Sequence, residues 1–197
     1  GVTTAIANNV AIPNGVTMIS PSATSPALST IADNGYFFRT APSDARQGQV
    51  LAQITMERGI NEVAVTFTNN DYGKGLSDSF INAYQGLGGK VSAIVPHDEG
   101  KADYSAEVGA LDASGAEVLA VFGYVDQGGR HIIQGSIDSG AFDKFILADG
   151  MFGDSLLANV DGDLSGTFGT VPGTDSKGAD RFAAMAKTAG IKVGGPF

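Results

Sequence analysis

Polar side chains gather where the apolar runs of this sequence end, and their types could hold a small charged molecule. Ser22 and Thr24 supply hydroxyl groups after the first such run. Tyr72 and Tyr124 follow two later runs, and a tyrosine offers an aromatic face with one polar group. Asp149 follows a further run and adds a carboxylate. In an open α/β sheet, ligands bind beyond the carboxyl ends of the strands, so these side chains are candidates for one shared site.

The chemistry of these groups matches an α-amino acid. A carboxylate such as that of Asp149 can pair with an ammonium group, and tyrosines can close over a small ligand. Backbone N–H groups at the start of a helix can hold a carboxylate, and we expect Ala23 and Thr24 to occupy such a position. Asp-Gly and Asn-Asp pairs are also ordinary turn formers. Spacing alone therefore leaves open whether these residues form a site or only turns.

The elements that must position these residues alternate between strands and helices. The predicted strands are nearly continuous apolar runs, which is typical of strands covered on both faces. Amphipathic helical patterns of about 10–15 residues separate them, as in βαβ units. The sequence therefore predicts an α/β fold with a doubly wound, mostly parallel sheet. The predicted strands span residues 62–68, 91–96, 117–122, 144–148 and 167–171.

The strand and helix pattern also divides the chain into three parts. Residues 42–172 hold four or five βα units and are predicted to form one complete lobe. Residues 1–41 are expected to form part of a second, similar lobe, and residues 173–197 to begin the return to it. The chain starts at Gly1 without Met and without a basic and apolar leader. We therefore expect a processed or truncated chain.

Local signals predict several element boundaries. Val2, Ile6 and Val10 recur at helical spacing and predict a helix with one apolar stripe. Ser43 is a predicted N-cap for a helix that ends near Gly59. A last amphipathic helix is predicted over residues 179–189.

Composition and missing motifs exclude several function classes. With 12 basic and 21 acidic residues the net charge is −9, which disfavours nucleic acid as a partner. No apolar stretch reaches the roughly 18–20 residues of a membrane-spanning helix, so we expect no direct membrane insertion. Cysteine is absent, and His97 and His131 lie outside metal-binding spacing. Since no catalytic or phosphate-binding motif is complete, the sequence predicts no enzyme, no cofactor and no metal site.

The order of the motifs resembles the leucine/isoleucine/valine-binding-protein family, which comprises type I periplasmic solute-binding proteins of ABC transporters. The resemblance runs in register over essentially the whole chain. It implies two α/β lobes that are joined by three crossings and close over an amino acid or similar small solute. The first two crossings are expected near residues 40–43 and 171–174. The motifs that carry the resemblance are Ser20–Pro26, Tyr36–Thr40, Asp71–Gly75, Gly123-Tyr124 and Asp149-Gly150.

The resemblance also implies roles for the candidate residues. Tyr72 and Tyr124 match tyrosines that face the ligand in that family. Asp149 falls where the family places an acidic residue, commonly Glu, for the α-ammonium group of the ligand. Because Asp is one methylene shorter, the ligand shape or a bridging water is expected to differ. The segment that holds the ligand carboxylate is matched by Ser22, Ala23 and Thr24.

The function implied by the resemblance is that of an extracytoplasmic solute receptor. It would bind an amino acid, such as a branched-chain one, in the periplasm and deliver it to a membrane ABC permease by hinge closure. One alternative is a ligand-sensing domain of a regulator or receptor with the same bilobal fold, which a fused output domain would reveal. A doubly wound enzyme with a nucleotide cofactor is a third class, but its glycine loop is incomplete at Gly73-Lys74-Gly75.

Overall fold

A parallel five-stranded sheet forms the centre of the computed structural model, which describes residues 1–173 and 177–191. Its strand order is β4-β3-β5-β6-β7, and every neighbouring pair is parallel. The prediction of an α/β fold with a mostly parallel sheet is confirmed, and each predicted strand overlaps an observed one. The strands are β3 (Glu62–Thr68), β4 (Lys90–His97), β5 (Val118–Phe122), β6 (Lys144–Leu147) and β7 (Phe168–Gly169).

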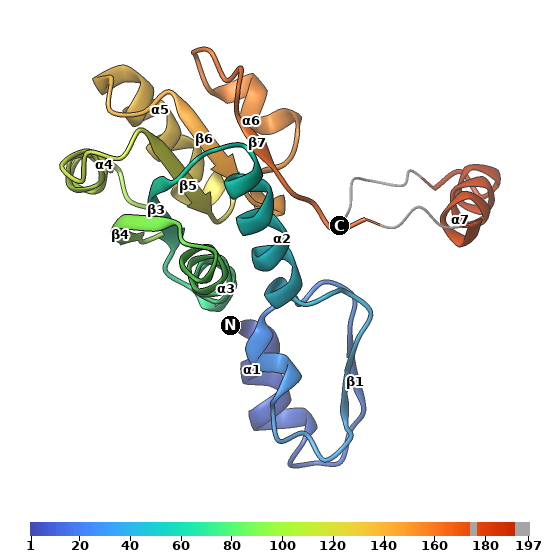
Figure 1. Cartoon of the computed structure of the whole chain (residues 1–197). Helices are drawn as coiled ribbons and strands as arrows, with labels where there is room; N and C mark the ends of the chain where they lie inside the picture. The colour runs from blue at the N-terminus through green and yellow to red at the C-terminus, as the bar shows by residue number, and fades with distance from the viewer. Residues whose placement is uncertain (174–176, 192–197) are drawn as a thin grey trace.

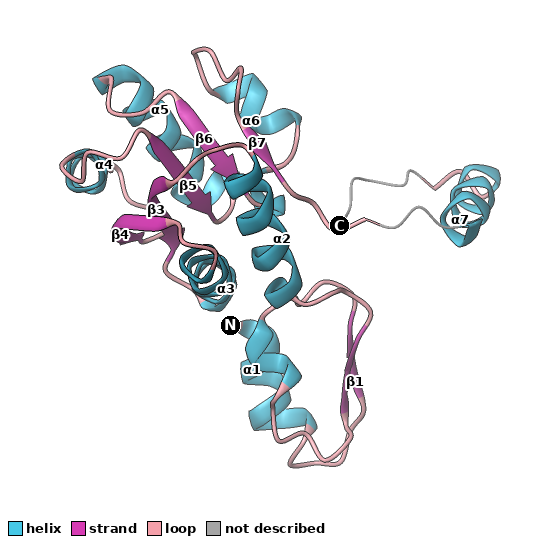
Figure 2. Ribbon diagram, in the orientation of Figure 1, coloured by secondary structure: helices cyan, strands magenta, loops and turns pink. Residues whose placement is uncertain are grey.

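Helices cover both faces of this sheet (Figure 2). On one face, α2 (Asp44–Glu57) and α3 (Asp71–Gly86) pack against alternate residues of β3 and β5. On the other face, α4 (Ser105–Asp112), α5 (Arg130–Ser139) and α6 (Asp154–Asn159) pack against the residues in between. The buried strands need apolar residues toward both cores, which explains why they lack polar alternation.

A smaller body precedes α2 and lies below the main lobe in Figure 1, at the end where α2 begins. It contains α1 (Val2–Ile6), a π-helical turn η1 (Ala7–Ala11), a 3₁₀ turn η2 (Pro26–Ser29) and the parallel strands β1 (Met18–Ser20) and β2 (Phe37–Arg39). Its core is formed by Ala7, Leu28 and Phe37.

The predicted N-terminal helix is present, but its apolar stripe is not buried. Val2, Ile6 and Val10 are all exposed, whereas Ala7 and Ala11 are buried, Ala7 in the small core. Small side chains allow the helical segment to lie close to the core residues Leu28 and Phe37.

The chain leaves the sheet after β7 toward α7 (Lys177–Thr188), which lies apart from both bodies (Figure 1). This helix overlaps the one predicted over residues 179–189. The predicted return segment, 173–197, includes residues 174–176 and 192–197, which lie outside the described residues, as does the end of the second expected crossing. Among the described residues no helix has the length and apolar character needed to span a membrane.

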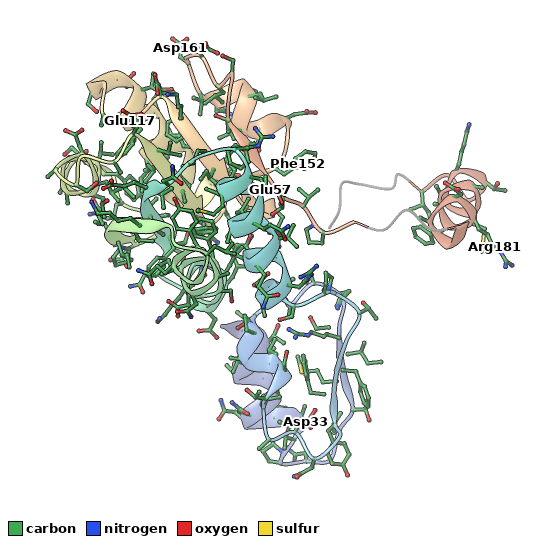
Figure 3. All side chains as sticks on the ribbon, in the orientation of Figure 1. Asp33, Glu57, Glu117, Phe152, Asp161 and Arg181 are labelled. Carbon is green, nitrogen blue, oxygen red and sulfur yellow. The ribbon has the colours of Figure 1, made fainter. Side chains whose placement is uncertain are left out.

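Two capped helices fix the chain at the edge of the sheet. The Ser43 hydroxyl accepts a hydrogen bond from the Ala45 amide at 3.3 Å, so the predicted N-cap of α2 is confirmed. The Asn70 side-chain oxygen accepts one from the Gly73 amide at 2.9 Å and caps α3. Because α2 leads into β3 and α3 leaves it, both helices start toward the carboxyl edge of the sheet. Glu117, labelled in Figure 3, precedes β5 and marks the opposite, amino edge of the sheet.

Candidate ligand-binding site

The strand order reverses between β3 and β5, which marks one place at the carboxyl edge of the sheet. Because β3 lies between β4 and β5, the connections that leave β3 and β5 diverge, and ligands of doubly wound folds bind at such a point. Tyr72 follows β3 and Tyr124 follows β5. Their ring centroids are 4.8 Å apart with planes inclined by 34°. Two tyrosines that lie 52 positions apart in the sequence thus form one aromatic surface.

Asp149 lies beside these tyrosines, in the short 3₁₀ turn η4 (Asp149–Met151) that follows β6. Its side chain is only 8% exposed. Its Oδ1 accepts hydrogen bonds from the Tyr72 hydroxyl and from the Gln47 side-chain amide, both at 2.8 Å. The Gly150 amide in turn donates to the Tyr72 hydroxyl at 3.1 Å. These bonds fix the carboxylate through one oxygen and leave Oδ2 for another partner.

Close backbone approach makes this arrangement depend on glycine. A Cβ on Gly150 would lie 2.3 Å from the carbonyl oxygen of Gly123 and 3.1 Å from the Tyr72 hydroxyl. The backbone after β6 therefore packs directly on the backbone after β5, and only a hydrogen atom fits between them.

The segment Ser22–Thr24 lies ahead of a helix rather than at its start. The 3₁₀ turn η2 begins at Pro26, with Ser25 as its N-cap, because the fixed φ of proline suits the first helical position. The Ala23 amide donates to the Ser20 hydroxyl at 3.0 Å. The prediction that Ala23 and Thr24 begin a helix is therefore wrong.

Thr24 is nevertheless held next to the main lobe. Its carbonyl accepts a hydrogen bond from the Asp44 amide at 3.0 Å, and its own amide has no partner among the described residues. The Arg39 guanidinium donates to the Ser25 carbonyl at 2.8 Å and so braces this loop. Pro26 packs against α3, where a Cβ on Gly75 would lie 3.0 Å from its ring.

The predicted residues thus divide into three groups. Tyr72 contacts both Tyr124 and Asp149, and Thr24 is hydrogen-bonded to the backbone of Asp44, which lies in the field of Asp149. Ser22 is exposed. Asp126, which also follows β5, has a side chain that is 83% exposed and lies 3.8 Å from Arg130, so it is outside the cluster.

Two residues of α2 belong to the cluster although the sequence analysis did not select them. The Gln47 side-chain amide donates to Asp149 and also to the Thr170 carbonyl, at 3.0 Å. Asp44 is buried in the first turn of the same helix. Both precede the first strand of the main sheet, so a search of strand ends does not find them. The one available signal is the Ser43 cap, which places Asp44 at the helix start.

Burial controls the protonation of the cluster. Burial, and then the Asp149 carboxylate, raise the pKa of Tyr72 above its usual range, and the same two causes raise the pKa of Tyr124. Both hydroxyls therefore stay protonated and can donate hydrogen bonds at neutral pH. Burial also raises the pKa of Asp44 to about 7. No group of three or more His, Asp or Glu side chains within the described part of the chain is arranged to hold a metal ion.

Comparison with known proteins identifies the family. Residues 1–194 match the family described as periplasmic binding proteins. The chain belongs to this family. The resemblance to the leucine/isoleucine/valine-binding proteins that the motifs indicated is confirmed by this match together with the relatives described below.

Individual relatives of this chain are named as binding proteins for leucine, isoleucine and valine. Leu/Ile/Val-binding protein homolog 1 of Brucella abortus (strain 2308) is 31% identical over 186 residues, which cover 91% of this chain and 49% of that protein. The leucine-, isoleucine-, valine-, threonine-, and alanine-binding protein of Pseudomonas aeruginosa is 30% identical over 165 residues, 80% of this chain and 42% of that protein. The chain therefore spans about half the length of these curated relatives.

Solved structures show the same fold. A leucine-binding protein from Thermotoga maritima superposes with a TM-score of 0.81 at 25% identity and covers 96% of this chain and 55% of its own. A substrate-binding protein from Desulfitobacterium hafniense in complex with Leu gives a TM-score of 0.67 at 21% identity and covers 91% of this chain and 52% of its own. The second comparison supports the fold alone.

Proposed function

We propose that this chain forms part of the solute-binding component of an ABC transporter and binds an aliphatic amino acid between two lobes. The observation that carries the proposal is the state of Asp149. Its carboxylate is buried beside two tyrosines, and one oxygen is fixed by Tyr72 and Gln47 while the other accepts no bond among the described residues. A buried carboxylate with a free oxygen suits a ligand ammonium group.

The remaining groups suit the rest of an amino acid. In our proposal Ser22, Ala23 and Thr24 receive the ligand carboxylate, chiefly through the free Thr24 amide and its hydroxyl. The paired rings of Tyr72 and Tyr124 form a wall with hydroxyls that can donate hydrogen bonds. The names of the relatives from Brucella and Pseudomonas favour a branched-chain or other small aliphatic side chain.

The proposal extends to the organisation of the whole protein. Residues 1–41 would belong to lobe one, residues 42–172 would form lobe two, and residues 173–197 would begin the return. The ligand would make more contacts in the closed conformation than in the open one, and so would favour closure of the lobes. The family supports a location in the periplasm, a membrane ABC permease as partner, and a binding role without catalysis or cofactor.

A binding measurement tests this function. The full-length gene product is titrated with leucine, valine and alanine and followed by thermal unfolding. A ligand at 100 times its dissociation constant stabilises the folded state by about 2.7 kcal/mol, and we expect that for at least one of them. The absence of stabilisation by every amino acid tested would overturn the proposal.

A substitution at Asp149 tests its proposed role in binding the ammonium group. Asp149→Asn keeps an acceptor for Tyr72 and Gln47 but removes the charge, and we expect affinity for the amino acid to fall by about 2–5 kcal/mol. Asp154→Asn, the same change at an exposed residue that begins α6, is the matched control and should bind normally. Equal affinity of Asp149→Asn and wild type would refute ammonium binding by Asp149.

A further inference from the structure

Asp44 is a buried carboxylate whose oxygens meet the full geometry of a hydrogen bond with no donor among the described residues, although the Thr24 side chain lies close enough to favour its charged form. It is the first residue of α2 and is 1% exposed. Neither of its carboxylate oxygens is in hydrogen-bonding geometry with a donor among the described residues. Buried carboxylates are normally paired or hydrogen-bonded, so a cationic partner from outside the described residues would stabilise the charged form of Asp44.

The surroundings of Asp44 do not compensate its charge. Asp149 of η4 adds a second carboxylate, and the hydroxyls of Tyr72 from α3 and Tyr124 from the turn after β5 are neutral. Within the part of the chain that the structure describes, Arg39 of β2 is the cation that favours the charged form of Asp44, and the Thr24 side chain favours it as well. The guanidinium of Arg39, however, donates its hydrogen bonds to the loop before η2, at Ala23, Ser25 and Ser29.

We propose that Asp44 is a specificity-determining residue of the ligand site, and that Asp44 and Asp149 form an acidic pair whose charge the ammonium group of the ligand compensates. This inference rests on the proposed function and deepens it. Asp44 is hydrogen-bonded through its backbone amide to Thr24 and lies in the field of Asp149, so it links the segment proposed for the ligand carboxylate with the residue proposed for the ammonium group. Ligands without an ammonium group would leave the pair uncompensated.

A proton balance follows from this arrangement. Burial, opposed in part by Thr24, and the Asp149 carboxylate raise the pKa of Asp44 to about 7, so we expect Asp44 to carry a proton at pH 6 before an amino acid binds. An arriving ammonium group favours the ionised carboxylate, the O–H bond breaks, and the proton passes to the buffer. Affinity for an amino acid should therefore fall as the pH falls below 7, by at most about tenfold per pH unit.

Calorimetry in two buffers of different ionisation enthalpy measures the released proton directly. The full-length gene product is titrated with leucine at pH 6 and pH 8, as wild type, Asp44→Asn and Asp154→Asn. We expect wild type and Asp154→Asn to release close to one proton at pH 6 and almost none at pH 8. Asp44→Asn should release none at either pH and bind leucine about tenfold or more weakly at pH 8, with a smaller difference at pH 6.

A ligand analogue separates charge recognition from shape. In 4-methylpentanoate the ammonium group of leucine is missing and the carboxylate remains. Asp44→Asn should bind this analogue at least as tightly as wild type does, because the ionised Asp44 repels an anion that carries no compensating charge.

The outcomes distinguish the two proposals. Failure of the wild-type protein to bind any amino acid overturns the proposed function and this inference together. Leucine binding by wild type without proton release at pH 6 overturns only the role of Asp44, and this result needs no variant to fold. Equal affinity and equal proton release in wild type and Asp44→Asn overturn it as well.

Discussion

His97 makes the stability of the main lobe sensitive to acid. It ends β4, is 1% exposed, and lies between two threonines: its Nδ1 is 2.8 Å from the Thr66 hydroxyl and its Nε2 is 3.0 Å from the Thr68 hydroxyl. A neutral ring can donate to one hydroxyl and accept from the other. Burial lowers the pKa of His97 to about 4, although Glu107 and Asp98 oppose the shift.

The size of the effect follows from linkage. The unfolded chain takes up a proton at His97 near pH 6.5, whereas the folded chain does so only near pH 4. The neutral His97 ring therefore makes its full contribution to the free energy of unfolding above pH 6.5. This contribution is lost as the pH falls from 6.5 to 4. A difference of about 2.5 pH units corresponds to about 3 kcal/mol of unfolding free energy.

Urea denaturation of wild type and His97→Gln at pH 7.5 and pH 4 tests this reasoning. Glutamine does not titrate and can still hydrogen-bond, so the stability of wild type relative to the variant should fall by about 3 kcal/mol at pH 4. The raised pKa of Asp44 makes stability depend on pH in the opposite direction. Because Asp44 is present in both proteins, its contribution cancels in the comparison. His131→Gln, at an exposed histidine, is the control. Parallel pH profiles for wild type and His97→Gln would refute the argument.

Two further substitutions probe the geometry of the site. Tyr72→Phe removes the hydrogen bonds to Asp149 and Gly150, and leucine affinity measured by calorimetry should fall by about 1–3 kcal/mol; an unchanged affinity would show that Tyr72 does not orient the carboxylate. Gly150→Ala places a Cβ against the Gly123 carbonyl and should lower the unfolding free energy in urea by about 1–3 kcal/mol. Gly86→Ala, where nothing lies within 4 Å of the added carbon, should be neutral or stabilising, and a similar loss in both variants would contradict the steric explanation.

Local patterns predicted most of the fold because their physical causes are local. Buried parallel strands are apolar on both faces, which made β3 and β5 visible as continuous runs. The Ser43 cap was likewise correctly predicted because a helix start needs a nearby acceptor. The start of a helix at Ala23 and Thr24 was predicted wrongly, since Pro26 delays it.

From the sequence, candidate site residues could be selected only by their position directly after a predicted strand. Tyr72, Tyr124 and Asp149 were found because each follows a strand, and their roles in binding remain predictions. Gln47 and Asp44 were missed because they lie on a helix that precedes the first strand of the main sheet.

The sequence by itself determined the order of the elements, the parallel sheet and the edge at which polar groups gather, because short-range apolar periodicity, caps and turns encode them. Only the tertiary structure decided which of those groups meet. The strand order sets β3 beside β5 and so brings the two tyrosine rings together. The packing of α2 brings Gln47 to Asp149, 102 residues away, and to Thr170, 123 residues away. Contacts over such separations depend on how whole elements pack, which no local pattern specifies.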